Sequence, residues 1–126
     1  VAEGTVFVTS MAKARVGRIS ALDAKGVSGC SGTPKVCRAL WTGRTVDPPS
    51  TAESPTVANG VVYLTTVQGR IQAFDARGSA RCSGRPRTCA ALWTKWTPGG
   101  YASSATIANG RVYLSNEKTF YAFGLP

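Results

Sequence analysis

The stretch SPTVANGVVYLTTVQGRIQAFDARGSARCSGRPRTCAALW, residues 54–93, has a near copy earlier in the chain and a partial copy after it. Its segment VANGVVYL (57–64) matches VAEGTVFV (1–8) and IANGRVYL (107–114). Its segment GRIQAFDA (69–76) matches GRISALDA (17–24), and FYAF (120–123) is similar to it. Repeats of about 50 residues made of short strands and turns are typical of propeller blades and β-solenoids. The repeat therefore predicts an all-β fold.

Each complete copy predicts four short antiparallel strands. In the second copy, the β-branched and aromatic residues at 61–66 are typical of a strand, and further strands are expected at 54–58, 70–76 and 90–96. The apolar residues at 61–66 do not alternate with polar ones, which suits a strand covered on both faces. Three blades are expected, at 1–47, 48–97 and 98–126, and the last of them lacks its outer strand. We expect one partial propeller of about two and a half blades, which cannot close a ring by itself.

The composition is basic. The 126 residues include 15 Lys and Arg, 6 Asp and Glu and no His, which gives a net charge of +9. Such a balance raises affinity for nucleic acid, anionic glycans and acidic lipid headgroups, but scattered charges are more simply interpreted as a solvated surface. No apolar run of about 18 residues occurs, so no membrane span is expected. The chain begins within its own repeat motif, and we expect it to be part of a longer protein.

Four cysteines form two pairs with equal spacing, Cys30 with Cys37 and Cys82 with Cys89. Four cysteines permit three disulfide connectivities, and the repeat favours the local one because two copies of one unit should fold alike. The alternative is structural zinc, but its paired ligands are usually about two to four residues apart, and no His is present to assist. Local disulfides predict an oxidising compartment, so we expect an extracytoplasmic or secreted protein.

The unit SPTVANGVVYL…GRIQAFDARG…LW resembles the PQQ-like (pyrroloquinoline-quinone-type) β-propeller repeat over nearly the whole chain. The tryptophan-docking pattern of that family, Ala-x-Asp followed by Gly and Trp, is matched by Ala21, Asp23 and Trp41 and again by Ala73, Asp75 and Trp93. In both copies a Cys loop lengthens the gap between Gly and Trp, a form similar to that of secreted actinobacterial proteins. The resemblance implies that each Trp packs between neighbouring blades while each Asp holds a turn.

Catalysis by this chain alone is not expected, and the quinone cofactor does not follow from the fold. Quinoprotein dehydrogenases of this family use a catalytic Asp, calcium ligands, adjacent cysteines and a Trp floor, whereas this chain has no adjacent cysteines. Its six acids form no pair spaced for acid–base or metal chemistry. We therefore expect no cofactor. The alternative is a part of a quinoprotein dehydrogenase whose active-site residues lie in absent blades.

The leading hypothesis is a non-catalytic binding or scaffolding module. Its expected partners are another protein or further blades that complete the ring, including other copies of this chain. A further alternative is binding of an anionic polymer, a wall glycan or a nucleic acid, through basic loops. The candidate residues crowd the second Cys loop and the segment after it: Arg77, Arg81, Arg85, Arg87, Lys95, Trp96 and Tyr101. An ordinary basic loop is the simpler interpretation of this group.

Overall fold

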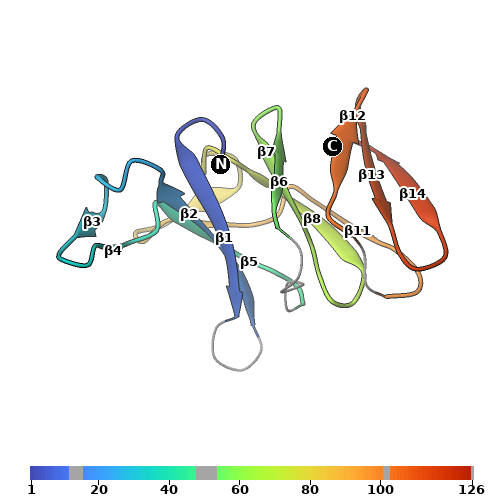
Figure 1. Cartoon of the computed structure of the whole chain (residues 1–126), viewed down its shortest axis with the longest axis horizontal. Coiled ribbons are helices and arrows are strands. Elements are labelled where there is room, and N and C mark those ends of the chain that lie inside the picture. Colours follow the sequence, from blue (N-terminus) through green and yellow to red (C-terminus); the bar gives the residue numbers. More distant parts are fainter. Residues whose placement is uncertain (12–15, 48–53, 101–102, 126) are drawn as a thin grey trace.

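The computed structural model describes residues 1–11, 16–47, 54–100 and 103–125. The regular elements within these ranges are all β-strands, numbered β1 to β14, so the predicted all-β class is confirmed. The described part of the chain contains no helix with the length and apolarity needed to cross a membrane. Three sheets lie side by side, with a separate hairpin at one end (Figure 1).

The second copy forms a four-stranded sheet, which we call the second sheet. Its order is β11 (Trp93–Trp96), β8 (Arg70–Asp75), β7 (Val61–Thr65) and β6 (Thr56–Ala58). Each neighbouring pair is antiparallel. The turn between β6 and β7 places Asn59 and Gly60 at φ 52° and 74°, in the left-handed region that tight hairpin turns require.

The first sheet combines strands from two copies. Its order is β1 (Thr5–Met11), β2 (Gly17–Asp23), β5 (Trp41–Arg44), β10 (Thr88–Cys89) and β9 (Cys82–Ser83). The last two strands form the Cys hairpin of the second copy, and β10 runs parallel to β5. The backbone N–H of Thr42 donates to the carbonyl of Arg87 at 3.0 Å across this pair. The sheet thus differs from the predicted four antiparallel strands, because the second hairpin extends the neighbouring sheet.

The third copy forms a smaller antiparallel sheet, β12 (Thr106–Ala108), β13 (Arg111–Ser115) and β14 (Phe120–Gly124), which we call the third sheet. The Cys loop of the first copy forms the hairpin β3 (Cys30–Ser31) and β4 (Val36–Cys37). In the described ranges this hairpin pairs with no other strand. We call it the free hairpin, and we call β9–β10 the docked hairpin.

Apolar side chains fill two layers between the three sheets. Between the first and second sheets the cluster contains Phe7, Ile19, Ala21, Trp41, Val62, Leu64 and Phe74. Between the second and third sheets it contains Tyr63, Ile71, Ala73, Val112 and Leu114. Successive side chains of a strand point to opposite faces, so β7 supplies both layers and is covered on both faces, as predicted for this segment. Full burial of each large apolar side chain contributes roughly 1.5–3 kcal/mol.

Candidate anion-binding cleft

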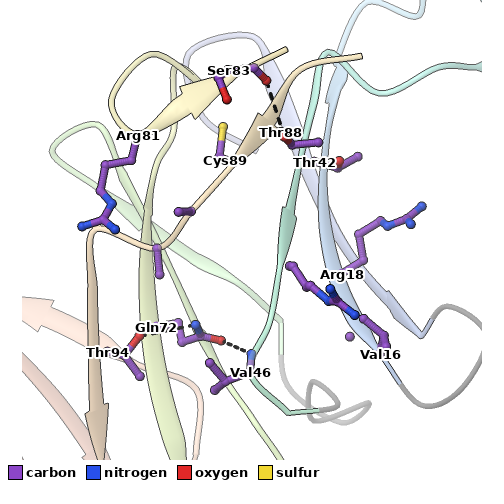
Figure 2. Close-up of a pocket in the computed structure, with 14 residues that line it drawn as sticks. Val16, Arg18, Thr42, Val46, Gln72, Arg81, Ser83, Thr88, Cys89 and Thr94 are labelled. Carbon is purple, nitrogen blue, oxygen red and sulfur yellow. Dashed lines mark hydrogen bonds between the residues drawn. The ribbon is translucent and has the colours of Figure 1, made fainter. Parts of the chain in front are cut away.

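A cavity of about 970 Å³ opens where the first and second sheets meet the docked hairpin. One side is lined by β2, β5 and the residues that follow β5, and the other by β8 and β11. Figure 2 shows Gln72 and Thr94 opposite Arg18 and Val16, with the docked hairpin at the upper end. Hydroxyl groups, three arginines, the amide of Gln72 and small apolar side chains make up the lining, and no Asp or Glu is among the described residues that form it. We call this cavity the cleft.

Three arginines line the cleft: Arg18 on β2, Arg44 on β5 and Arg81 before β9. All three are exposed, and in the described ranges none of them forms an ion pair with a carboxylate. Arg18 and Arg44 are direct cross-strand partners in the β2–β5 ladder. Like charges directly opposite each other on antiparallel strands destabilise a sheet. An anion bound beside this pair would offset the repulsion.

Arg81 has a backbone conformation that favours glycine. Its φ is 55°, and the equivalent residue before the free hairpin is Gly29, with φ 72°. A non-glycine residue in the left-handed region costs about 1–2 kcal/mol, and strain of this kind is concentrated at functional sites. The second copy therefore places a guanidinium at the cleft where the first copy has no side chain.

Gln72 forms a buried polar wall of the cleft and is 1% exposed. Its Oε1 accepts a hydrogen bond from the backbone N–H of Val46 at 3.0 Å, and its Nε2 donates to Oγ1 of Thr94 at 3.4 Å. A salt bridge also joins the segment after β5 to β8, since Nε of Arg70 lies 3.3 Å from Oδ2 of Asp47. These contacts connect the segment after β5 to the second sheet and so maintain the shape of the cleft.

The chemistry of the cleft suits binding of an anion. Guanidinium groups present planar pairs of N–H donors that match the oxygens of phosphate, sulfate and carboxylate groups, and they remain charged at physiological pH. The hydroxyl groups of Thr42 and Ser83 lie on the same lining and can add neutral donors. Among the residues that the structure describes, no group of three His, Cys, Asp or Glu side chains could hold a metal ion.

The two aspartates of the docking pattern hold equivalent turns next to the Cys hairpins. The carboxylate of Asp75 accepts hydrogen bonds from the backbone N–H groups of Arg77 at 3.1 Å, Ser79 at 2.9 Å and Ala80 at 2.6 Å. Asp23 accepts from the three equivalent N–H groups of the first copy. Each aspartate therefore fixes the direction in which the chain leaves its sheet for the hairpin.

Both aspartates titrate below the usual range for a carboxyl group. Hydrogen bonds from the backbone of Ser28, Lys25 and Val27 lower the pKa of Asp23 from its ordinary value. Partial burial raises the pKa of Asp75, but the three backbone hydrogen bonds to its carboxylate outweigh burial and leave the pKa below its ordinary value. The charged form of each aspartate is the one that the fold favours.

The two tryptophans of the docking pattern lie at different joints. Trp41 is 3% exposed between the first and second sheets and lies opposite Ala21 in the β2–β5 ladder. Its Nε1 donates to the carbonyl of Ala76 at 3.2 Å. Trp93 is only half-buried and lies opposite Ala73 in the β11–β8 ladder.

Each Cys hairpin is closed by a local disulfide. The S–S distances are 2.05 Å for Cys30–Cys37 and 1.97 Å for Cys82–Cys89, and these are the pairings that the repeat predicts. Cys89, on β10 of the first sheet, is 5% exposed, whereas both cysteines of the free hairpin are half-buried. A short closed loop of this kind stabilises a fold by roughly 2–3 kcal/mol.

Among the predicted binding residues that the structure describes, only Arg81 lines the cleft. Nε of Arg77 lies 3.6 Å from Oε2 of Glu3. Nη1 of Arg87 donates to the carbonyl of Gly78 at 2.8 Å. Arg77 and Arg87 therefore make contacts within the fold and are not part of the cleft lining.

The other predicted binding residues do not gather at one place. Arg85 is exposed between β9 and β10. Lys95 and Trp96 are exposed on β11 outside the cleft lining, and Tyr101 lies outside the described residues. The sequence grouping joined residues that are close in the chain, whereas the cleft joins residues from both copies.

Sequence reasoning missed Arg18 and Arg44. Both residues lie at the ends of short strands, and their proximity depends on the register that pairs β2 with β5. The alternation of Arg18 with the buried Ile19 was the available signal, because it places the arginine on the opposite face of its strand.

No protein-family model matches this chain, and no curated protein matches it. The PQQ-like assignment therefore stays a prediction from the repeat. The function proposed below depends on the geometry of the cleft.

Proposed function

We propose that this chain is a non-catalytic binding module built from PQQ-like propeller blades, and that its cleft holds an anionic polymer in an extracytoplasmic compartment. One observation carries the proposal: Arg18, Arg44 and Arg81 line one cavity without carboxylate partners in the described ranges. The two disulfides are in keeping with an oxidising compartment. The side-by-side sheets support the blade architecture (Figure 1).

The lining favours an anionic glycan over a nucleic acid. Proteins that hold single-stranded nucleic acid stack the bases on aromatic side chains. The described lining of the cleft has hydroxyl, methyl and guanidinium groups but no aromatic ring. Sulfate, phosphate or carboxylate groups carried on a sugar chain match that set of donors, because they need charge and hydrogen bonds without stacking. We therefore propose a wall-type anionic glycan as the ligand class.

A calcium site of the quinoprotein type does not fit the cleft. Bound Ca²⁺ requires carboxylate and carbonyl oxygens around it. Three exposed guanidinium groups at one cavity create a positive potential, which repels a cation and attracts an anion. The charge of the cleft therefore argues against a calcium site within it, whereas the quinoprotein alternative places its active-site residues in absent blades.

Arg44→Gln is the first test, with a heparin oligosaccharide as the sulfated-glycan probe and an oligothymidylate as the nucleic-acid probe. A hydrogen bond to a charged group is worth about 1.5–3 kcal/mol, so we expect affinity for heparin to fall about tenfold or more by titration calorimetry. The matched control is Arg85→Gln, which removes the same charge from an exposed turn outside the cleft.

The control variant should lose less than about fivefold, because Arg85 lies outside the cleft lining and acts on the ligand only through long-range attraction that salt screens. Equal losses for the two variants would show that only net charge matters and would contradict a cleft site. Tighter binding of oligothymidylate than of heparin would reverse the choice of ligand class. Wild-type affinity should also fall as salt is added, because salt screens interactions between exposed charges.

A further inference from the structure

Apolar side chains are exposed on the two outward faces of the stack of sheets. On the outer face of the first sheet, Val8 is 42% exposed, and Val6 and Leu22 are partly exposed. On the outer face of the third sheet, Phe120 is 91% exposed and Tyr113 is 40% exposed. Figure 1 shows these sheets on opposite sides of the second sheet. Exposed apolar faces of this kind mark interaction sites.

The outer face of the first sheet corresponds to a face that is buried elsewhere in the chain. By the sequence repeat, Val6, Val8 and Leu22 are equivalent to Val62, Leu64 and Phe74. Those three residues of the second sheet pack against the first sheet. In the third sheet the equivalents Val112, Leu114 and Phe123 pack against the second sheet. Each copy therefore carries the same apolar surface for its preceding neighbour.

The outer face of the third sheet corresponds to the other half of that interface. Tyr113 and Phe120 are equivalent to Tyr63 and Ile71. In the second sheet these residues are buried against the third sheet, at 2% and 0% exposure. In the first sheet the equivalent Phe7 and Ile19 are buried against the second sheet. Each copy thus carries the same surface for its following neighbour.

We infer that a second copy of this chain docks head to tail, with Tyr113 and Phe120 of one copy packed on Val6, Val8 and Leu22 of the next. The chain already makes this type of contact twice, between its first and second sheets and between its second and third sheets. The two exposed faces are complementary halves of that contact. A heterologous contact repeats with each added copy, so the assembly is a closed ring or an open filament.

The inference does not depend on anion binding, and the test separates the two. Association is measured by sedimentation velocity at high ionic strength. The added salt suppresses association through a polyanion and screens the repulsion between basic chains. Under these conditions the mass of the wild-type protein should increase with concentration above the 13.2 kDa of one chain. A protein that stays monomeric at every concentration would overturn the inference, because it would show that the two exposed faces do not bind another copy of this chain.

Two variants each remove one half of the contact. Phe120→Asp disables the outer face of the third sheet, and Val8→Asp disables that of the first sheet. Both residues are exposed, so the fold should remain intact by circular dichroism. Each variant alone should stay monomeric. The matched control is Val27→Asp, at a residue that is 67% exposed outside both faces, and it should associate like the wild type.

Mixing the two variants tests the direction of the contact. The Phe120→Asp chain keeps its Val8 face and the Val8→Asp chain keeps its Phe120 face, so the two should form a dimer that grows no further. A mixture that remains monomeric, or single variants that associate like the wild type, would contradict head-to-tail docking.

Discussion

Two joints between neighbouring sheets contain the same tryptophan pattern but differ in how tightly they close. At the first joint Trp41 is 3% exposed, stacks on Phe74 with the ring centroids 6.3 Å apart at 28°, and contacts Phe7 at 6.0 Å. At the second joint Trp93 is half-buried and meets Phe123 edge-on, at 5.8 Å and 77°. The same residue type therefore has a central role at one joint and a lesser one at the other.

The docked hairpin accounts for the difference. The chain leading to it passes over Trp41, since the carbonyl of Ala76 accepts the indole hydrogen bond and Gly78 lies against the ring. In the described residues no hairpin of a following copy extends the second sheet in this way. Burial of a docking tryptophan thus depends on the hairpin of the following copy as well as on the Ala-x-Asp…Trp pattern.

A single glycine adds to the contrast. A Cβ at Gly43 on β5 would lie 2.7 Å from Cε1 of Phe74 and 2.9 Å from Cγ2 of Ile19. Contacts that short cannot form without movement of the neighbours. The equivalent residue on β11 is Lys95, which is exposed. At the first joint Gly43 therefore lets Phe74 and Ile19 pack directly against β5, whereas the second joint has the long side chain of Lys95 at the equivalent position.

The largest expected effect comes from truncating the two tryptophans. Trp41→Ala should lower the free energy of unfolding by about 3–5 kcal/mol, because it removes a fully buried ring and leaves a cavity. Trp93→Ala should cost about 1–2 kcal/mol, because less of its area is buried. Urea unfolding at equilibrium measures both. Equal costs would mean that the two joints are equivalent in solution.

Gly78→Ala and Gly26→Ala form a matched pair that isolates the contact with the first tryptophan. Both glycines have positive φ, at 66° and 63°, so both substitutions carry a backbone cost of about 1–2 kcal/mol. A Cβ at Gly78 would lie 2.2 Å from Cδ1 of Trp41, whereas one at Gly26 would meet only Cδ of Lys35 at 4.0 Å. We expect Gly78→Ala to cost a further 1–3 kcal/mol or so. Similar unfolding curves for the two variants would contradict a stabilising contact between Trp41 and the segment that leads to the docked hairpin.

A smaller effect is expected from acid, and it should involve both hairpins. The pKa of Asp23 and that of Asp75 lie below the ordinary carboxyl value. A carboxyl group with a lowered folded-state pKa stabilises the fold above its unfolded-state pKa, and this stabilisation is lost as the pH falls through the folded-state pKa. Unfolding free energy should therefore decrease below about pH 4. Asp75→Asn should reduce that decrease, and an unchanged acid profile would contradict the assignment.

The repeat was sufficient to predict much of the fold and little of the cleft. Strand composition predicted the segments that became β7 and β8, because β-branched and aromatic residues cluster there. The parallel pairing of β10 with β5 was not predictable, since it involves Thr88 and Cys89 alone on one side and joins residues from different copies. That pairing places the docked hairpin, and Arg81 before it, at the cleft, whereas Arg18 and Arg44 meet through the register of β2 with β5. The three arginines therefore come together through pairings that their positions in the chain do not group.

The affinity of an Arg81→Gly variant for the heparin oligosaccharide tests the central claim most directly. Glycine is the residue that the first copy has at this position, and it suits the left-handed backbone. The variant should therefore remain at least as stable as the wild type by urea unfolding. The account predicts affinity about tenfold weaker or more, since a charge-assisted contact is lost. Affinity equal to that of the wild type, in a protein that is fully folded, would contradict a binding role for the cleft.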